Sequence, residues 1–248
     1  QFNPANDVEF DHQVGILGLA RPNTQSRQVK NTGDFDVAIA INRHGLRDDK
    51  DVAEAKPGDL LVVGDSAAWG WGVEARARFS DLVQARTGIA TFNLSTPTDI
   101  RGYHALLDYA ERLGSKARRV ILAVSMETDL DRYDLPPPAP QADDESGSWL
   151  EELRFRLART STTYTYLVAV VHQTPWLNDL AVRAGLIIPN FQGMSQNAYL
   201  PETIASSADL VAALTSRYRL TVLIIPSRGL WIGANRTVED RVHTAFVS

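Results

Sequence analysis

The chain has 248 residues, a net charge of -5 and 44% apolar residues, so it can bury a substantial core as one large domain or one domain with insertions. Its lysines and arginines are scattered, which argues against nucleic acid or an anionic membrane as the main partner. It contains no cysteine, which excludes disulfides, thiol catalysis and zinc sites built on cysteine.

Residues 1–58 are predicted to form an irregular and partly β extension that packs on a core. From Asp34 to Ile41, polar and apolar side chains alternate, which is typical of a half-exposed strand. The stretch "NRHGLRDD" that follows is typical of a turn. The breaker cluster "KPG" then predicts that a new unit begins at Asp59.

From Asp59 onward, apolar runs alternate with helical patterns. This alternation predicts parallel strands in a sheet that helices cover on both faces. We expect strands at 59–65, 89–95, 118–126 and 220–227, and helices at 79–86, from Thr98 or Asp99 to about 113, from 201 to about 218, and after Thr237.

Residues 134–200 interrupt this rhythm and are predicted to be an insertion. Its first part, 134–148, is proline-rich and then acidic, which is typical of an exposed loop. The composition of 150–172 favours a helix, although its middle is rich in threonine and tyrosine. We expect 173–200 to be irregular.

A serine follows the first predicted strand, in the stretch "LLVVGDSAAWGWGV". Ligands of open α/β sheets bind outside the carboxyl ends of the strands, where Ser66 would lie. A serine attacks an ester when a base takes its proton and backbone donors stabilise the oxyanion, and the small Ala67 and Ala68 leave such donors accessible. The spacing is not the Gly-x-Ser-x-Gly elbow, because position 68 is alanine. By themselves, the letters Gly-Asp-Ser favour a plain strand-ending turn.

Four blocks together change this interpretation: "NRHGLRD", "KPGDLLVVGDSAAWGWGV", "FNLSTPTD" and "VILAVSMETDL". They resemble the SGNH (GDSL-like) hydrolase superfamily, closest in style to its bacterial extracytoplasmic esterases and O-acyltransferases. The resemblance covers roughly residues 40–135 and, more weakly, "LIIPSRGLW". It implies a flavodoxin-like three-layer α/β sandwich with a central parallel sheet, and Ser66 as a nucleophile activated by a histidine that an aspartate orients. With the four apolar runs, it predicts a strand order 2-1-3-4 in which the first strand is central.

The chain departs from the family pattern at two oxyanion-binding positions. Thr98 stands where the family has a glycine that offers its backbone N–H, and a β-branched residue tolerates fewer backbone conformations. Thr128, before Asp129, stands where the family has an asparagine side chain, and a hydroxyl is shorter than an amide. Losing one oxyanion donor can lower the rate about 10²–10³-fold. We therefore expect an oxyanion hole that is rebuilt or weak, with a polar loop residue as the alternative role for Thr128.

The family's last block, Asp-x-x-His, follows a fifth strand. Asp240 and His243 match its letters as orienter and base, but they lie inside a periodic helix soon after the fourth strand, where an acid is favoured by the helix dipole alone. We favour the interpretation that these two are ordinary helix residues. We then expect the natural chain to continue past Ser248 with the fifth strand and the true motif, and we expect Ser66 to have no histidine within reach in this chain.

Asp65 and Trp69 complete the predicted substrate-binding residues. Trp69 and Trp71 have two interpretations of equal weight, as the lining of a sugar or acyl pocket and as a hydrophobic plug over the sheet edge. No cluster of His, Asp or Glu has metal-ligand spacing, so we predict neither a metal nor a cofactor.

These observations predict a serine esterase or O-acyltransferase that acts on small acyl esters, with acetyl esters of carbohydrate foremost, through an acyl-enzyme on Ser66. The alternative is a non-catalytic glycan-binding or assembly module on a degenerate SGNH fold. A phosphate or nucleotide binder is least favoured, because neither Gly-x-Gly-x-x-Gly nor a P-loop is present.

The resemblance also predicts an extracytoplasmic location. No stretch of the sequence reads as a signal peptide or approaches the roughly 20 apolar residues of a membrane span. The chain begins with Gln1 rather than Met, which suggests either that an upstream segment such as a cleaved signal or membrane anchor was removed, or that the sequence starts at an internal boundary.

Overall fold

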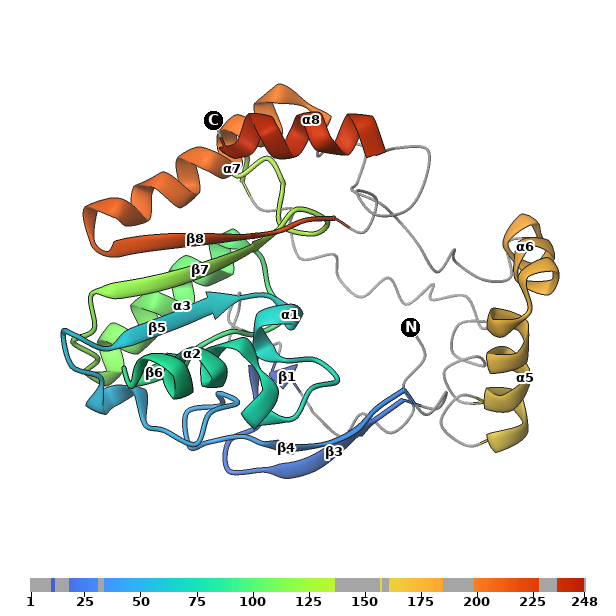
Figure 1. Cartoon of the computed structure of the whole chain (residues 1–248), viewed down its shortest axis with the longest axis horizontal. Coiled ribbons are helices and arrows are strands. Elements are labelled where there is room, and N and C mark those ends of the chain that lie inside the picture. Colours follow the sequence, from blue (N-terminus) through green and yellow to red (C-terminus); the bar gives the residue numbers. More distant parts are fainter. Residues whose placement is uncertain are drawn as a thin grey trace.

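The computed structural model describes residues 10–11, 18–30, 34–136, 157, 161–184, 199–227 and 236–247. Its centre is a four-stranded parallel sheet in the order β6-β5-β7-β8, flanked by helices (Figure 1). The strands are β5 (Leu60–Gly64), β6 (Thr91–Asn93), β7 (Arg119–Ser125) and β8 (Arg219–Ile225). The predicted parallel sheet and its order 2-1-3-4 are confirmed.

Strand β5 is central because its apolar run is continuous. All five of its residues are buried, as expected for a strand with covered faces on both sides. Leu61 and Val63 face the main core, and in register Leu61 pairs with Phe92 on one side and Val120 on the other. The carboxyl end of β5 therefore lies between the ends of two neighbouring strands.

Strand β8 has a similar apolar run but lies at the edge of the sheet. Val222 and Leu223 are 39% and 41% exposed, although they pair in register with Leu122 and Ala123 of β7. The prediction of a fourth core strand is thus correct for the pairing and wrong for the burial: among the described residues, β8 has one strand neighbour, β7, and most of its side chains are exposed.

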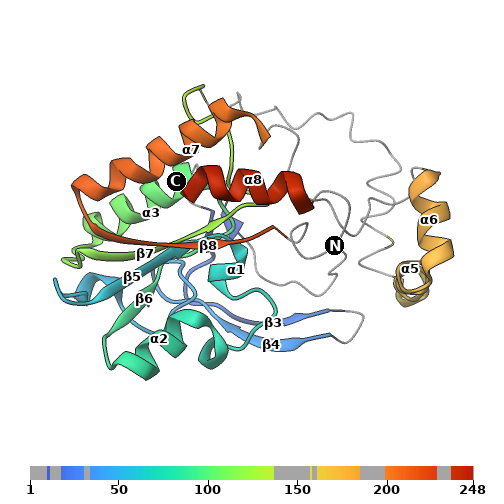
Figure 2. The ribbon, with the colours of Figure 1, turned by 45° about the horizontal axis from the view of Figure 1, so that its top comes forward.

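Helices α3 (Ile100–Leu113) and α7 (Pro201–Ala213) lie on one face of the sheet, and α2 (Phe79–Thr87) lies on the other (Figure 2). The carboxylate of Asp99 caps α3 by accepting the Gly102 N–H at 2.8 Å. Gly114 ends α3 at a φ of +112°, a conformation that favours glycine. The largest fully buried side chains of this core come from α3 and the elements around it: Tyr103, Leu46, Leu61, Leu94, Ile100, Leu106, Leu107, Leu122 and Leu214.

The N-terminal extension contributes two antiparallel pairs. Strands β1 (Phe10–Asp11) and β2 (Leu19–Ala20) form one, and β3 (Gln25–Val29) and β4 (Asp36–Ala40) form the other. Burial alternates along β4, so the predicted half-exposed strand is confirmed. Its inward side chains pack with Trp69 in a second hydrophobic cluster: Ala20, Val37, Ile39, Ile41 and Trp69.

Three further helices lie in the C-terminal half: α5 (Thr162–Gln173), α6 (Pro175–Arg183) and α8 (Arg236–Val247). The expectation of irregular structure over 173–200 is wrong for 175–183, where Pro175 begins a helix at the position that proline favours. The predicted loop after 136 and the stretch 185–198 lie outside the described residues. None of the helices in the described ranges has the length and apolar character that crossing a membrane would need.

Candidate functional site

Ser66 lies at the carboxyl end of the central strand. It is the first residue of α1 (Ser66–Trp69), two residues after β5 ends, and its side chain is half-buried. Because β6 and β7 run parallel to β5, their carboxyl ends open at the same edge of the sheet (Figure 1). This edge is where open α/β sheets bind ligands.

The turn that holds Ser66 is fixed by its neighbours. The carboxylate of Asp65 accepts the Ala67 N–H at 2.8 Å, which caps α1. Gly64 leaves no room for a side chain, since a Cβ there would lie 2.7 Å from the Cβ of Ala68 and 2.8 Å from that of Ala123. Gly70 ends α1 at a φ of +91°. The sequence Gly-Asp-Ser therefore makes a tight strand–turn–helix connection.

A group of acidic and hydroxyl side chains, here called the acid network, lies beside this turn. It consists of Asp65, Tyr103, Ser125, Thr128 and Asp129. The Asp129 carboxylate accepts the Ser125 N–H at 2.7 Å and the Tyr103 hydroxyl at 2.8 Å. The Thr128 Oγ1 lies 3.1 Å from Asp129 Oδ1 and 3.5 Å from Asp65 Oδ2. The network joins the end of β5 to the end of β7 and to α3.

Burial changes the acidity of this network. Asp129 is 0% exposed, and burial raises its pKa to about 7, with the neighbouring Asp65 carboxylate raising it further. Burial also raises the pKa of Asp65, while hydrogen bonds from the Ala67 and Ala68 amides oppose that rise. The pKa of Tyr103 is raised by burial and by Asp129, so its hydroxyl keeps its proton and donates it.

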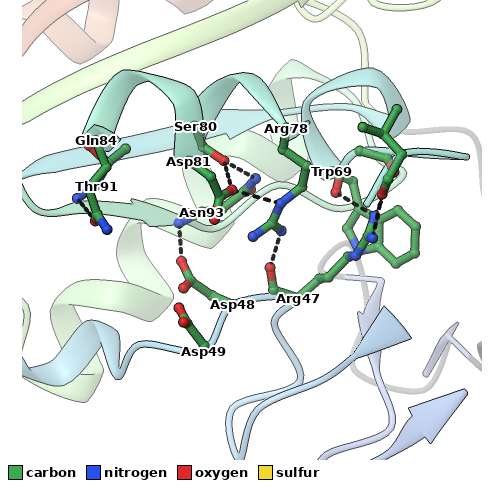
Figure 3. A network of polar contacts seen from close by, with 12 residues as sticks. Arg47, Asp48, Asp49, Trp69, Arg78, Ser80, Asp81, Gln84, Thr91 and Asn93 are labelled. Atoms are coloured by element: carbon green, nitrogen blue, oxygen red, sulfur yellow. Dashed lines mark hydrogen bonds and ion pairs between the residues drawn. The ribbon is translucent and has the colours of Figure 1, made fainter. Parts of the chain in front are cut away.

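The opposite side of the turn is held by what we call the arginine network: Arg47, Asp48, Arg78, Asp81 and Asn93 (Figure 3). The Arg47 guanidinium lies 4.7 Å from the centre of the Trp69 ring and donates to the carbonyl of Gly70 at 2.5 Å. It also donates to three further carbonyls, those of Trp69, Ala38 and Val73. These contacts hold the loop that follows α1.

Two more members tie the arginine network to α2 and β6. Arg78 donates to the carbonyl of Arg47 and pairs with Asp81 at 2.9 Å. The side-chain amide of Asn93 donates to the carbonyl of Ala68 at 2.9 Å. The backbone N–H of Asn93 donates to the Asp48 carboxylate at 2.6 Å (Figure 3). Burial and the neighbouring Arg78 lower the pKa of Arg47 to about 10, so the guanidinium stays charged at neutral pH.

The predicted substrate-binding residues have different surroundings. Asp65 is 8% exposed and caps α1, and the exposed Thr128 places its hydroxyl between two carboxylates. Thr98 is half-buried and packs so closely on Gly102 that a Cβ there would lie 2.0 Å from the Thr98 hydroxyl oxygen. Trp69 is 1% exposed inside the second hydrophobic cluster. This burial favours the interpretation of Trp69 as a hydrophobic plug.

Within the described ranges, no hydrogen bond joins Ser66 to a histidine. His104 contacts the carbonyl of Leu210 at 2.8 Å, and His44 contacts Asp51 at 2.8 Å. In α8, which packs against α7, Asp240 is exposed and His243 is half-buried. The described contacts join neither of these two to Ser66 or to each other. The base and orienter suggested by the motif thus stay a prediction from sequence.

Sequence reasoning missed the arginine network. It assigned "NRHGLRDD" to a turn, whereas Arg47 and Asp48 of that stretch are buried supports of the Ser66 loop. The one feature of the sequence that pointed to a role for this stretch was that it is one of the four blocks that resemble the SGNH superfamily. Arg47, Asp48 and Arg78 also line an open hollow of about 780 Å³ between the β3–β4 hairpin and the core, and Ser66 is not among its lining residues.

In the part of the chain that the structure describes, no three His, Cys, Asp or Glu side chains are grouped to hold a metal ion. Comparison of the chain with known protein families, with curated proteins and with solved structures finds no match.

Proposed function

We propose that the chain is an SGNH-type serine esterase or O-acyltransferase that carries its acyl group on Ser66. The observation that supports this most is the placement of a half-exposed serine at the carboxyl end of a central parallel strand, in a turn held from two sides. A plain strand-ending turn requires no such support. The four sequence blocks of the SGNH resemblance supply the reaction class and the extracytoplasmic location.

The proposed cycle has two steps. The Ser66 Oγ attacks the ester carbonyl, the bond from carbonyl carbon to alcohol oxygen breaks, and the alcohol leaves with the serine proton. Water or a sugar hydroxyl then takes the acyl group and restores the serine. Small acetyl esters of carbohydrate are the substrates that the resemblance favours, and no metal or cofactor enters the cycle.

The expected rate of turnover is limited by the lack of a described general base at Ser66. Because no described histidine is hydrogen-bonded to Ser66, we expect slow turnover, driven by binding and oxyanion contacts rather than by efficient proton transfer. The same observation favours a second candidate, a non-catalytic glycan-binding or assembly module on the same fold. Ser66 would then be a turn residue and the strand-end site a binding surface.

Turnover of one small acetyl ester separates the two candidates. The experiment compares the wild-type chain, Ser66→Ala and the control Ser216→Ala, which removes an exposed hydroxyl from the turn that leads into β8. The esterase proposal expects slow turnover that Ser66→Ala abolishes and Ser216→Ala leaves unchanged. Equal and negligible rates in three folded proteins, with retained binding of an acetylated oligosaccharide, would favour the binding module.

A further inference from the structure

The Thr128 hydroxyl lies between two buried carboxylates, and its single hydrogen cannot be donated to both of them. Its oxygen is 3.1 Å from Asp129 Oδ1 and 3.5 Å from Asp65 Oδ2. A threonine hydroxyl has one hydrogen to donate and lone pairs that accept. If both aspartates are ionised, this single hydrogen satisfies one carboxylate, and two negative charges remain buried side by side.

No described cation relieves this charge. Neither Asp65 nor Asp129 has an ion pair with Lys, Arg or His in the described ranges, and Arg101, the cation at the start of α3, stacks over the Tyr133 ring at 5.4 Å instead. The ionisable groups of the packed elements that contact the pair are Tyr103 of α3, whose hydroxyl donates to the Asp129 carboxylate, and Tyr133 of the loop after β7, whose hydroxyl donates to the Asp129 carbonyl. Asp99 and Asp131 lie near Tyr133 and add negative charge rather than a cation. A buried acid without a cation is stabilised by taking up a proton.

We propose that Asp65 and Asp129 hold one proton between them, with the Thr128 hydroxyl as the bridge. The proton lies on Asp129 Oδ1 and is donated to Thr128 Oγ1. The hydroxyl hydrogen of Thr128 is in turn donated to Asp65 Oδ2. With this direction, both contacts of Thr128 become hydrogen bonds, and one of the two buried negative charges disappears.

The surroundings of the two carboxyl groups decide which of them is protonated. Asp65 Oδ1 accepts the Ala67 amide, and the Ala68 amide and the Ser125 hydroxyl also donate to this carboxylate, so its ionised form is favoured. On Asp129, Oδ2 already accepts the Ser125 amide and the Tyr103 hydroxyl, which leaves Oδ1 for the proton. The raised pKa of Asp129, about 7, agrees with this assignment.

This bridge makes Thr128 a positioning residue. Its hydrogen is directed to Asp65, the cap of α1, so it is not available to an oxyanion in this arrangement. Loss of the shared proton at alkaline pH would leave two charges at the start of α1 and disturb the turn that holds Ser66. The inference does not rest on the esterase proposal, because the bridge exists whether or not Ser66 reacts.

Carbon-13 NMR of the aspartate carboxyl groups, recorded from about pH 4 to about pH 9, tests the bridge directly. We expect one carboxyl with a midpoint near neutral pH, missing in Asp129→Asn and retained in Thr128→Ser. In Thr128→Val, the midpoint should be displaced, and the Asp65 signal should no longer follow the Asp129 titration. Thr128→Ala serves the same test if the valine variant fails to fold.

The proposal is overturned if both carboxyl groups ionise with ordinary acidic midpoints, or if Thr128→Val titrates like the wild type. The Ser66→Ala variant is the matched control and should titrate like the wild type, since the bridge does not involve its hydroxyl. The titration does not depend on ester turnover. A chain without esterase activity can therefore still confirm the bridge, and an active chain can still refute it.

Discussion

The two sides of the Ser66 turn bury charge in opposite ways. On the acid side, Asp65 and Asp129 are buried with hydroxyl and amide donors around them and no ion pair to a cation in the described ranges. On the arginine side, Arg47 meets the fixed carbonyl oxygens of four residues and the ring of Trp69. The acid side has no described cation, whereas the arginine side meets the charge of Arg47 with backbone carbonyls and that of Arg78 with a carbonyl and the Asp81 carboxylate.

This difference predicts different responses to pH. Carbonyl oxygens do not titrate, and the pKa of Arg47, about 10, keeps its charge constant around neutral pH. The pKa of Asp129, about 7, places the charge change of the acid side within the neutral range. The Arg47 contacts therefore support the turn equally across neutral pH, and the acid network supports it best below neutral pH.

The largest expected effect is the loss of the Arg47 guanidinium. Arg47→Met leaves buried carbonyls without donors and should lower the free energy of unfolding by about 3–5 kcal/mol. Arg27→Met is the control, since this arginine of β3 is exposed and pairs with Asp36 at the surface. It should cost less than about 1 kcal/mol. Equal losses in denaturant unfolding would contradict the role given to Arg47.

The second prediction concerns the pH dependence of stability. Asp129 has a folded pKa of about 7 and an ordinary value of 3.8, so between these values the unfolded chain has released a proton that the folded chain retains. Rising pH therefore favours unfolding over this window, by at most about 4 kcal/mol at about 1.4 kcal/mol per pKa unit. Asp129→Asn should remove this component. Identical pH profiles of the unfolding free energy in wild type and Asp129→Asn would rule it out.

A smaller effect is expected from Asp81→Asn on the arginine side. The change removes the carboxylate that pairs with Arg78 but keeps the Arg78 bond to the carbonyl of Arg47. We expect a loss of about 1–2 kcal/mol, since this ion pair is only partly exposed. The loss should stay constant across neutral pH. If the stability loss caused by Asp81→Asn changed strongly around neutral pH, the two networks would not differ in their response to pH as we expect.

The smallest effect is expected at Thr128. Thr128→Ser keeps the bridging hydroxyl and should change stability by less than about 0.5 kcal/mol, whereas Thr128→Val should cost about 1 kcal/mol at neutral pH. Thermal unfolding of the two variants under one set of conditions measures the difference. Equal stabilities would mean that the hydroxyl contributes nothing to the acid network.

The fold could be predicted from the sequence wherever a local pattern of residues indicates the element. The continuous run Leu60–Val63 indicated a buried parallel strand, and the alternation in "DFDVAIAI" indicated a half-exposed one. The run in β8 looks the same as a core strand, because hydrophobic letters do not reveal how many neighbours a strand has. Edge position is a property of the assembled sheet.

Only part of the site was predicted, because a sequence shows local motifs but not contacts between distant segments. Ser66 was indicated by its place after a strand, and Asp65 by the same motif. Arg47 was missed because three of its carbonyl partners lie 22 to 26 residues further along the chain, and backbone groups leave no mark in a sequence. The contact of Thr128 with both Asp65 and Asp129 likewise exists only once β5 and β7 are side by side.

Peptide mass mapping after incubation with excess small acetyl ester shows directly whether Ser66 carries an acyl group. We expect one acetyl group on the peptide that contains Ser66 in the wild type and in Ser216→Ala, and none on that peptide in Ser66→Ala. A folded wild-type chain without acetyl on this peptide, or the same acetylation in Ser66→Ala, would rule out Ser66 as the nucleophile.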